Sequence, residues 1–380
     1  MKEGWEVKKL TDVCNIQYGY AFDSSCFCDD NSYPQLIRIR DVVRGYSETF
    51  YNGNIPEGYY INKGDYLIGM DGEFHIAPWQ SEKALLNQRV CKISASDCNV
   101  DERFIFYKMS VVLKQIEDET PFVTVKHLSA KRLNQVKIPI PPLPEQSRIV
   151  EELDLLSNII EKKRQQLSEL ENLAQTIFYD MFGDPVTNEK GWEVKKLGKV
   201  CLIERGGSPR PISAFITNDV NGVNWIKIGD AEDGSMYINS TKEKIKPEGV
   251  KKSRMVHKGD FILSNSMSFG KPYILGVDCC INDGWLVIRD ENNVFDKSFL
   301  YYYLGSSFIY NEFKRLAVGG VVNNLNSELV RGVSVAIPSF NLQQLFAQKI
   351  EAIEKKKALI KQSIAETEEL FNSRMDYYFS

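Results

Sequence analysis

The strongest constraint on the fold of this chain is a repeated heptapeptide. The letters GWEVKKL occur at Gly4–Leu10 and again, unchanged, at Gly191–Leu197. Self-similarity of this kind is the sequence signature of a structural unit that occurs more than once. Because 380 residues also exceed the usual size of one domain, the repeat predicts at least two domains of the same fold.

The similarity continues past the heptapeptide, in the same order in both halves. Each half contains an alternating apolar segment that reads as a strand, a Lys-Gly-Asp turn before an apolar run, an aromatic helical face, and a short helix followed by a strand. The paired segments are 36–42 with 225–231, 63–69 with 258–264, 100–109 with 295–304, and 125–141 with 323–338. The sequence therefore predicts an α/β (α+β) module in two copies with different loops.

A long helix is predicted after each module. Apolar residues recur at alternating spacings of four and three over 149–181 and again over 346–371. This rhythm is typical of a coiled-coil seam, with Lys163 and Lys357 as polar residues at equivalent positions. Two matching seams in one chain can pair with each other. We therefore expect antiparallel helices and pseudo-twofold symmetry, with the elements in the order module, helix, module, helix.

The same patterns predict the boundaries of five segments. They are a first module at 1–143, a first helix at 144–182, a linker at 183–190, a second module at 191–338 and a second helix at 339–380.

Composition and charge narrow the class of protein. With 43% hydrophobic and 26% charged residues, no run of eighteen apolar residues and no apolar leader, the chain is expected to be cytoplasmic, with no membrane segment. Eight cysteines without a CxxC pair, and only three histidines, predict no metal centre. The net charge of −4 is unevenly distributed, because residues 144–189 carry 4 basic and 10 acidic groups whereas residues 190–337 carry 20 and 16. Basic surfaces that suit nucleic acid are therefore compatible with this total.

The order of these motifs resembles a known family. GWEVKKL before a module, ERGGSPRP (204–211), WIKIGD (225–230), KGDFILS (258–264), IPIPPLPEQ (138–146) and FYDMFGDP (178–185) are similar to the DNA-specificity subunit of type I restriction–modification systems. The resemblance covers essentially the whole chain. It departs from the pattern in the second half, where PSFNLQQ replaces PPLPEQ and Asn323 and Asn324 replace Lys126 and His127.

The resemblance implies a function. In that family each module reads one half of a bipartite, gapped sequence in double-stranded DNA, and the paired helices set the gap and dock two methyltransferase subunits. Motor-nuclease subunits complete the restriction complex. Adenine-N6 methylation with S-adenosylmethionine, and ATP- and Mg²⁺-dependent cleavage, belong to the partners, so this chain is expected to bind no cofactor. Consistent with a non-catalytic chain, the sequence has neither an FxGxG-like loop nor an [ND]PP[YF] tetrad.

A reader of DNA needs cations for phosphates and polar side chains for base edges. In the first module Arg38 and Arg40 are expected to alternate on a strand face, and Gly19 is expected to let the backbone approach DNA closely. The candidate contacts in this module are Gln17, Tyr18, Tyr20, Arg38, Arg40, Asn87, Gln88, Arg89, Lys126 and His127.

In the second module the loop from Arg205 to Arg210 is expected to offer two arginines and backbone amides freed by glycine. The candidate contacts in this module are Arg205, Gly206, Gly207, Ser208, Arg210, Lys227, Ser264, Asn265, Ser266, Ser268, Lys271, Asn323 and Asn324. Because the loops of the two modules differ, we predict unlike half-sites and an asymmetric target.

Two alternatives remain open from the sequence. The chain could be a coiled-coil scaffold whose modules bind proteins, which a salt-sensitive affinity for DNA would exclude. It could also serve a methylation-only or fused-nuclease relative of type I systems, which the copurifying subunits would reveal.

Overall fold

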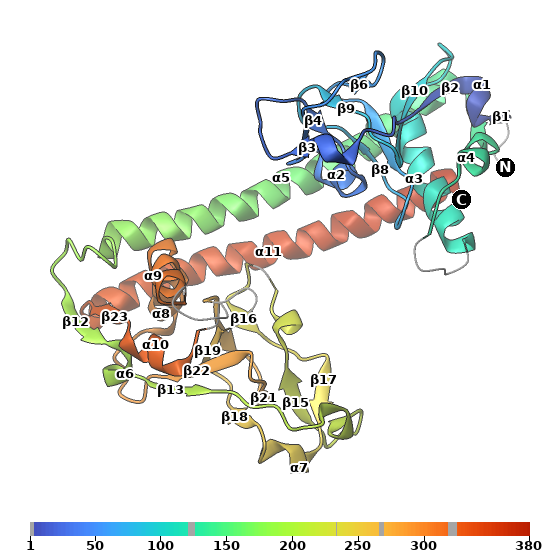
Figure 1. The fold of residues 1–380 in the computed structure, drawn as a ribbon. Helices are drawn as coiled ribbons and strands as arrows, with labels where there is room; N and C mark the ends of the chain where they lie inside the picture. Colours follow the sequence, from blue (N-terminus) through green and yellow to red (C-terminus); the bar gives the residue numbers. More distant parts are fainter. Residues whose placement is uncertain (1–3, 121–125, 233, 266–269, 318–324) are drawn as a thin grey trace. The chain divides into compact units, whose positions relative to one another are not determined.

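The computed structural model describes residues 4–120, 126–232, 234–265, 270–317 and 325–380. The chain forms two compact units, one of Met1–Lys162 with Ser363–Ser380 and one of Lys163–Gln362 (Figure 1). Each unit therefore combines one module with parts of two long helices, α5 (Leu143–Phe182) and α11 (Phe340–Phe379). No helix within the described ranges is long and apolar enough to cross a lipid bilayer.

Within the described residues, the module of the first unit contains eleven short strands around a central antiparallel sheet. Its elements are β1 (Glu6–Lys9), α1 (Leu10–Val13), β2 (Cys14–Tyr18), β3 (Phe27–Cys28), β4 (Gln35–Leu36), α2 (Ile39–Arg44), β5 (Phe50–Tyr51), β6 (Tyr60–Ile61), β7 (Tyr66–Gly69), β8 (Ile76–Pro78), β9 (Ala84–Leu85), β10 (Val90–Ala95), α3 (Glu102–Glu119), α4 (Ala130–Asn134) and β11 (Lys137–Ile140). The central sheet has the order β2-β10-β7-β8, a second sheet has the order β3-β5-β4-β9-β6, and β1 pairs with β11.

The module of the second unit repeats this plan. Its elements are β12 (Glu193–Lys196), α6 (Leu197–Val200), β13 (Leu202–Arg205), β14 (Ile216–Thr217), β15 (Val223–Ile226), β16 (Tyr237–Ile238), β17 (Glu243–Ile245), α7 (Pro247–Val250), β18 (Arg254–Val256), β19 (Phe261–Ser264), β20 (Pro272–Leu275), β21 (Cys279–Ile281), β22 (Trp285–Arg289), α8 (Lys297–Gly305), α9 (Ser307–Ala317), α10 (Ser327–Gly332) and β23 (Ser334–Ile337). The order β13-β22-β19-β20 matches β2-β10-β7-β8, and β12 pairs with β23 as β1 does with β11. The duplicated α/β fold predicted from the repeat is therefore confirmed.

Local chemistry explains where the helices begin. Asp101 accepts hydrogen bonds from the backbone amides of Arg103 and Phe104 at the start of α3, and Asp296 does the same at the start of α8. A buried glutamine ties each of these caps to a long helix. Gln146 accepts from the amide of Asp101 at 2.8 Å, and Gln343 accepts from the amide of Asp296 at 2.8 Å.

The long helices pair in antiparallel fashion within each unit. In the first unit Glu152 of α5 accepts hydrogen bonds from Arg374 and Tyr378 of α11. In the second unit Glu171 of α5 pairs with Lys357 of α11 at 2.7 Å. Within the first unit Arg148 contacts Tyr378 whereas Glu152 contacts Arg374. Within the second, Glu171 contacts Lys357 whereas Phe178 packs against Phe346. In each unit residue numbers therefore fall along α11 as they rise along α5, which confirms the predicted direction.

Residues of the predicted helix seams lie in the hydrophobic cores of both units. Ile149 and Leu153 of α5 lie in the core of the first unit with residues of α3, whereas Phe346 and Ile350 of α11 lie in the core of the second with residues of α8. The seam residues thus bury apolar surface against a module as well as against the other helix, and this burial is the main stabilising term.

The segments 36–42 and 225–231 are strands only in their first residues, so the alternation predicted strands that are too long. The strand β4 ends at Leu36, and Arg38 and Arg40 lie at the start and inside of helix α2. The cause is an acid three residues on, since the carboxylate of Asp41 accepts from the amide of Arg38 at 2.9 Å and closes a helical turn. In the second module Asp230 accepts from the amide of Lys227 at 2.9 Å in the same way.

Candidate nucleic-acid interface

In the first module the end of β2 crosses the loop before β10. Gly19 donates to the carbonyl of Val90, Tyr20 donates to the carbonyl of Leu86, and Gln88 donates to the carbonyl of Tyr20 at 2.8 Å. A Cβ atom on Gly19 would lie 1.9 Å from the carbonyl oxygen of Asn87. Glycine is thus required by the neighbouring loop, and the expectation that the backbone at Gly19 approaches DNA stays a prediction.

The same crossing brings together three side chains at the surface of the module. We call the surface beside the crossing the polar edge, or edge, of each module. Arg89 lies with its Nε 3.6 Å from Asp71 and its Nη1 3.3 Å from His127. Nδ1 of His127 lies 2.5 Å from Oδ1 of Asp71. Arg89 and His127 are about half exposed, whereas Asp71 is largely buried between them. We call Asp71, Arg89 and His127 the Arg89 cluster.

Among the other candidates of the first module, some side chains are exposed and others form hydrogen bonds within the module. Gln88 is exposed, whereas Asn87 is buried and its side-chain oxygen accepts from the amide of Gln88. Gln17 donates to the carbonyl of Gly58 at 2.6 Å, and Tyr18 donates to Asn134 at 2.8 Å. Burial is the main cause that raises the pKa of Tyr18 to about 12, so its hydroxyl stays protonated at neutral pH.

Four further candidates of the first module are Tyr20, Lys126, Arg38 and Arg40. Tyr20 is exposed and packs with Tyr59, the ring centres 5.1 Å apart. Lys126 donates to the carbonyl of Glu117, at the end of α3, at 2.6 Å. Arg38 and Arg40 are exposed at α2, which contacts strand β7.

The second module repeats the crossing with different side chains. Gly206 donates to the carbonyl of Trp285 at 2.9 Å and Gly207 to that of Ile281 at 3.1 Å. A Cβ on Gly206 would lie 2.0 Å from the carbonyl oxygen of Asn282. Both amides are therefore used inside the module, which corrects the expectation that they are free to bind DNA.

Two backbone hydrogen bonds next to this crossing have the same pattern in both modules, and we call them the backbone junction. In the first, Met70 donates to the carbonyl of Arg89, and Leu128 donates to the carbonyl of Met70. In the second, Asn265 donates to the carbonyl of Gly284, and Leu325 donates to the carbonyl of Asn265. The position of Arg89 in the first module thus corresponds to Gly284 in the second.

Asp283 organises the second edge. It accepts from Ser208 Oγ at 2.5 Å, its backbone carbonyl accepts from Arg205 Nε at 3.1 Å, and its carboxylate lies 3.9 Å from Arg210. The hydrogen bond from Ser208, aided by the charges of Arg205 and Arg210, lowers the pKa of Asp283. The loop thus presents two arginines around one carboxylate.

Several other candidates of the second module are buried or paired with groups of the same module. Ser264 and Asn265 are buried, and Asn265 donates to the carbonyl of Asp283 at 2.9 Å, so the expectation that they reach DNA is corrected. Ser264 lies in β19, and its side-chain oxygen accepts from the amide of Lys271 at 3.0 Å. Lys227 pairs with Glu243 at 2.5 Å and is about half exposed. Ser266, Ser268, Asn323 and Asn324 lie outside the described residues.

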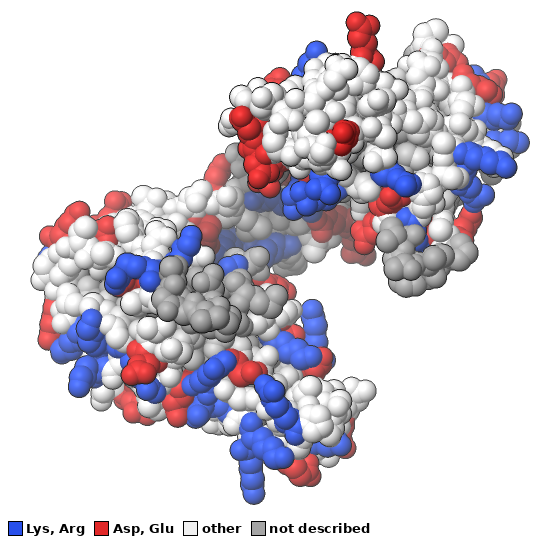
Figure 2. Space-filling view, viewed as in Figure 1, with Lys and Arg blue, Asp and Glu red and all other residues white. Residues whose placement is uncertain are grey.

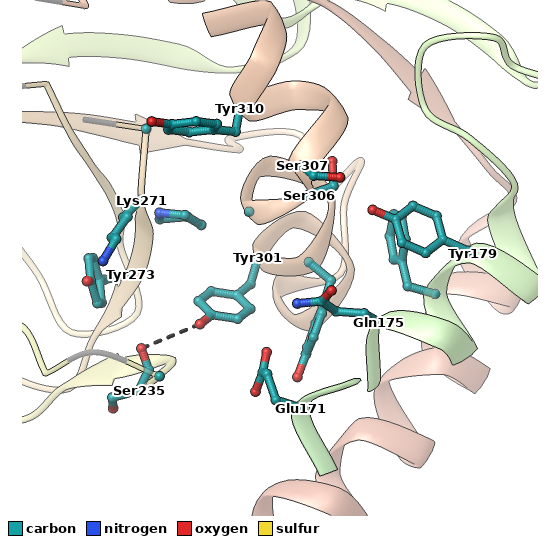
Figure 3. A pocket seen from close by; sticks show the side chains of 16 residues that line it. Glu171, Gln175, Tyr179, Ser235, Lys271, Tyr273, Tyr301, Ser306, Ser307 and Tyr310 are labelled. Carbon is teal, nitrogen blue, oxygen red and sulfur yellow. Dashed lines mark hydrogen bonds between the residues drawn. The ribbon is translucent and has the colours of Figure 1, made fainter. Parts of the chain in front are cut away.

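Lys271 lines a pocket of about 450 Å³ in the second unit (Figure 3). Glu171 and Gln175 of α5 form one wall, and Tyr301 of α8 projects toward Ser235, to whose carbonyl it donates at 3.5 Å. This setting places Lys271 in a pocket lined by several tyrosines, and its contact with DNA stays a prediction.

The candidates from the sequence omit several groups that the structure places at or near the edges. Asp71 and Asp283 were missed because acids are not obvious DNA ligands, although each lies among the predicted arginines. A group of cations around β17, α7 and β18 was also missed (Figure 2). We call Lys242, Lys244, Lys246, Lys251 and Lys252 the lysine cluster. Their density in 242–252 was the signal in the sequence.

These features define a class of protein with two like modules, unlike polar edges and a pair of antiparallel helices. A family model for the type I restriction modification DNA specificity domain matches residues 2–172 and 189–369. Because these matches cover most of the chain, it belongs to the type I restriction–modification DNA specificity family, whose members are non-catalytic and recognise DNA within a restriction–modification complex.

Individual relatives agree with this assignment. The chain is 29% identical over 376 residues to the EcoBI specificity subunit of Escherichia coli, covering 92% of this chain and 79% of that protein. It is 24% identical to the MjaVIII specificity subunit of Methanocaldococcus jannaschii, covering 93% and 86%. The S subunit of M. genitalium has a similar fold, with a TM-score of 0.55 at 14% identity over 100% of this chain and 98% of that one.

Proposed function

We propose that each module recognises one half of a bipartite, asymmetric, gapped sequence in double-stranded DNA. The observation that best supports this proposal is the shared backbone junction with unlike side chains. The first edge presents Gln88 and the Arg89 cluster, whereas the second presents Arg205, Ser208 and Arg210 around Asp283. One fold that displays two different sets of donors and acceptors suits two different sequences.

The two edges also differ in charge, which supports unequal phosphate contacts. The lysine cluster belongs to the second module, and its members at 242, 244 and 246 alternate with Glu243 and buried Ile245 across β17. Lys244 lies within β17, and Lys242 and Lys246 flank the strand on either side. Such cations attract phosphates without regard to sequence, so we assign them a role in positioning DNA.

The partners follow from the same proposal. The paired helices α5 and α11 would set the number of unread base pairs between the half-sites and dock two methyltransferase subunits. Motor-nuclease subunits would complete an assembly that methylates adenine N6 and cleaves DNA with hydrolysis of ATP. S-adenosylmethionine, ATP and Mg²⁺ would be bound by those partners and by none of this chain's residues, and the assembly would act in the cytoplasm.

Sequencing of methylated adenines in cells that carry the complete system tests the proposal. We expect a split motif with unlike halves, and we expect Gln88→Ala to relax preference in one half while leaving the other unchanged. A continuous or palindromic motif would contradict the proposal. Copurification of methyltransferase subunits without motor-nuclease subunits would instead indicate a methylation-only system.

A further inference from the structure

Arg89 has a backbone conformation that arginine rarely adopts. Its φ is 70°, in the left-handed region that favours glycine. Strain of this kind concentrates at functional sites, where a particular side chain is needed despite the cost. The position of Arg89 within a predicted DNA-contacting edge fits that pattern.

The contacts of the Arg89 cluster fix the direction of the guanidinium. Nδ1 of His127 lies 2.5 Å from Oδ1 of Asp71, so we assign the Nδ1 proton to this hydrogen bond. A protonated Nδ1 cannot accept, so the 3.3 Å approach of Arg89 Nη1 to the same atom is a packing contact. The other oxygen of Asp71 lies 3.6 Å from Nε of Arg89. Asp71 therefore holds the inner side of the guanidinium.

The side chains of the Arg89 cluster differ in their exposure to solvent. The side chain of Asp71 is 22% exposed, whereas that of Arg89 is 52% exposed. Asp71 is itself held by the backbone, because it forms an isolated antiparallel bridge with His127. A carboxylate fixed at the inner side of an exposed arginine limits the rotamers of that arginine and leaves outer N–H groups toward solvent.

We propose that Asp71 is a positioning residue that orients Arg89 to read a guanine in the half-site of the first module, with His127 holding the carboxylate. This inference rests on the proposed function. A guanidinium presents parallel N–H donors that match O6 and N7 of guanine in the major groove. The second module has glycine at the equivalent position, so this guanine contact belongs to one half-site only.

The test uses the assembled complex with the target defined by the wild-type methylation motif. Each base pair of both half-sites is replaced in turn, and the affinity of each duplex is measured. Arg89→Ala is expected to reduce discrimination about 10–100-fold at one G·C pair of one half-site and to leave the other half-site unchanged. Arg89→Gly is expected to do the same without lowering Tm, since glycine tolerates the left-handed backbone.

Asp71→Asn tests the positioning role. We expect discrimination at the same base pair to fall about 3–10-fold, with the affinity for unrelated DNA unchanged, because only the orientation of Arg89 is altered. In the Arg89→Ala background, Asp71→Asn should cause no further loss of discrimination. The matched control is Glu73→Gln, which removes one exposed charge from the same loop and should leave every preference unchanged.

Three results would contradict the roles of Arg89 and Asp71 or the function on which they rest. If Arg89→Ala leaves discrimination intact at every base pair of both half-sites, or alters the second half-site, the assignment of Arg89 is wrong. If Asp71→Asn lowers affinity equally for all duplexes, or lowers discrimination further without Arg89, Asp71 has a different role. If the wild-type complex shows no split sequence preference, the proposed function itself fails, and that result is independent of the variants.

Discussion

Lys357 of α11 donates a hydrogen bond to Glu171 of α5 at 2.7 Å, from a seam position that is otherwise apolar. Lys357 also donates to Glu354 at 2.8 Å and is only 5% exposed. Burial alone would lower the pKa of this lysine, but its hydrogen bonds to the two glutamates outweigh that effect and raise it. The ion pair between Lys357 and Glu171 joins the two helices within the second unit. Removing the lysine would leave the carboxylates of Glu171 and Glu354 without a counter-charge.

Replacing Lys357 by Met is expected to destabilise the second unit by about 1–3 kcal/mol, because two partly buried carboxylates lose their counter-charge. Urea unfolding followed by circular dichroism measures the change. Lys355→Met is the matched control, since Lys355 is exposed and pairs with Glu351 one turn away on the same helix. Equal stability of the two variants would show that the interaction with Glu171 contributes nothing.

Gln146 and Gln343 are expected to be among the most sensitive polar positions. Each is fully buried and makes three hydrogen bonds to backbone groups, and those of Gln146 join Asp101, Asn99 and Pro141. Either Gln→Ala change should cost about 2–4 kcal/mol, since it leaves several buried backbone groups unsatisfied. Thermal unfolding tests this, with Gln344→Ala on the exposed face of α11 as control. A loss of stability as small as that of the control would contradict the prediction.

Gly19→Ala and Gly206→Ala are expected to disrupt their modules. A Cβ would lie 1.9 or 2.0 Å from a backbone carbonyl oxygen, so a loop must shift in either variant. We expect a loss of about 2–4 kcal/mol together with loss of sequence preference in the matching half-site. Gly229→Ala is the control, because nothing lies within 4 Å of its added Cβ. Two well-folded variants with native Tm would refute this account of the crossing.

The lysine cluster is expected to control the salt dependence of DNA affinity. Changing Lys244, Lys246 and Lys252 to Gln should reduce the slope of log affinity against log salt by about 0.9 for each phosphate that the protein no longer neutralises. The reduction should be the same for target and unrelated duplexes, because phosphate contacts carry no sequence information. Titration at several salt concentrations measures it, with Lys355→Gln as control. An unchanged slope in the triple variant would remove these lysines from the interface.

The repeat and the helices could be predicted because their signals are local. The heptapeptide GWEVKKL, the Lys-Gly-Asp turns before β7 and β19, and the seam of each long helix depend on spacing within a few residues. Such patterns fix which side of an element is apolar, and therefore which side is buried. The direction of helix pairing followed from the presence of two seams in one chain.

The polar edges were harder to predict because exposure depends on distant segments. Ser264 and Asn265 are polar and were candidates for DNA contact, yet both are buried, and Asn265 donates to the carbonyl of Asp283. The alternation at Arg38 and Arg40 suggested a strand, but a hydrogen bond to Asp41 made a helix. The steric need for glycine at position 19, set by the carbonyl of Asn87, also comes from a distant segment.

The sequence by itself determined that one α/β module occurs twice and that a seamed helix follows each copy. Only the tertiary structure decided which polar side chains face solvent, that Gly284 is the counterpart of Arg89, and that Asp71 lies behind that arginine. The physical reason is that periodicity is a property of neighbouring residues, whereas the burial and orientation of a polar group are set by hydrogen bonds from residues far away in the chain.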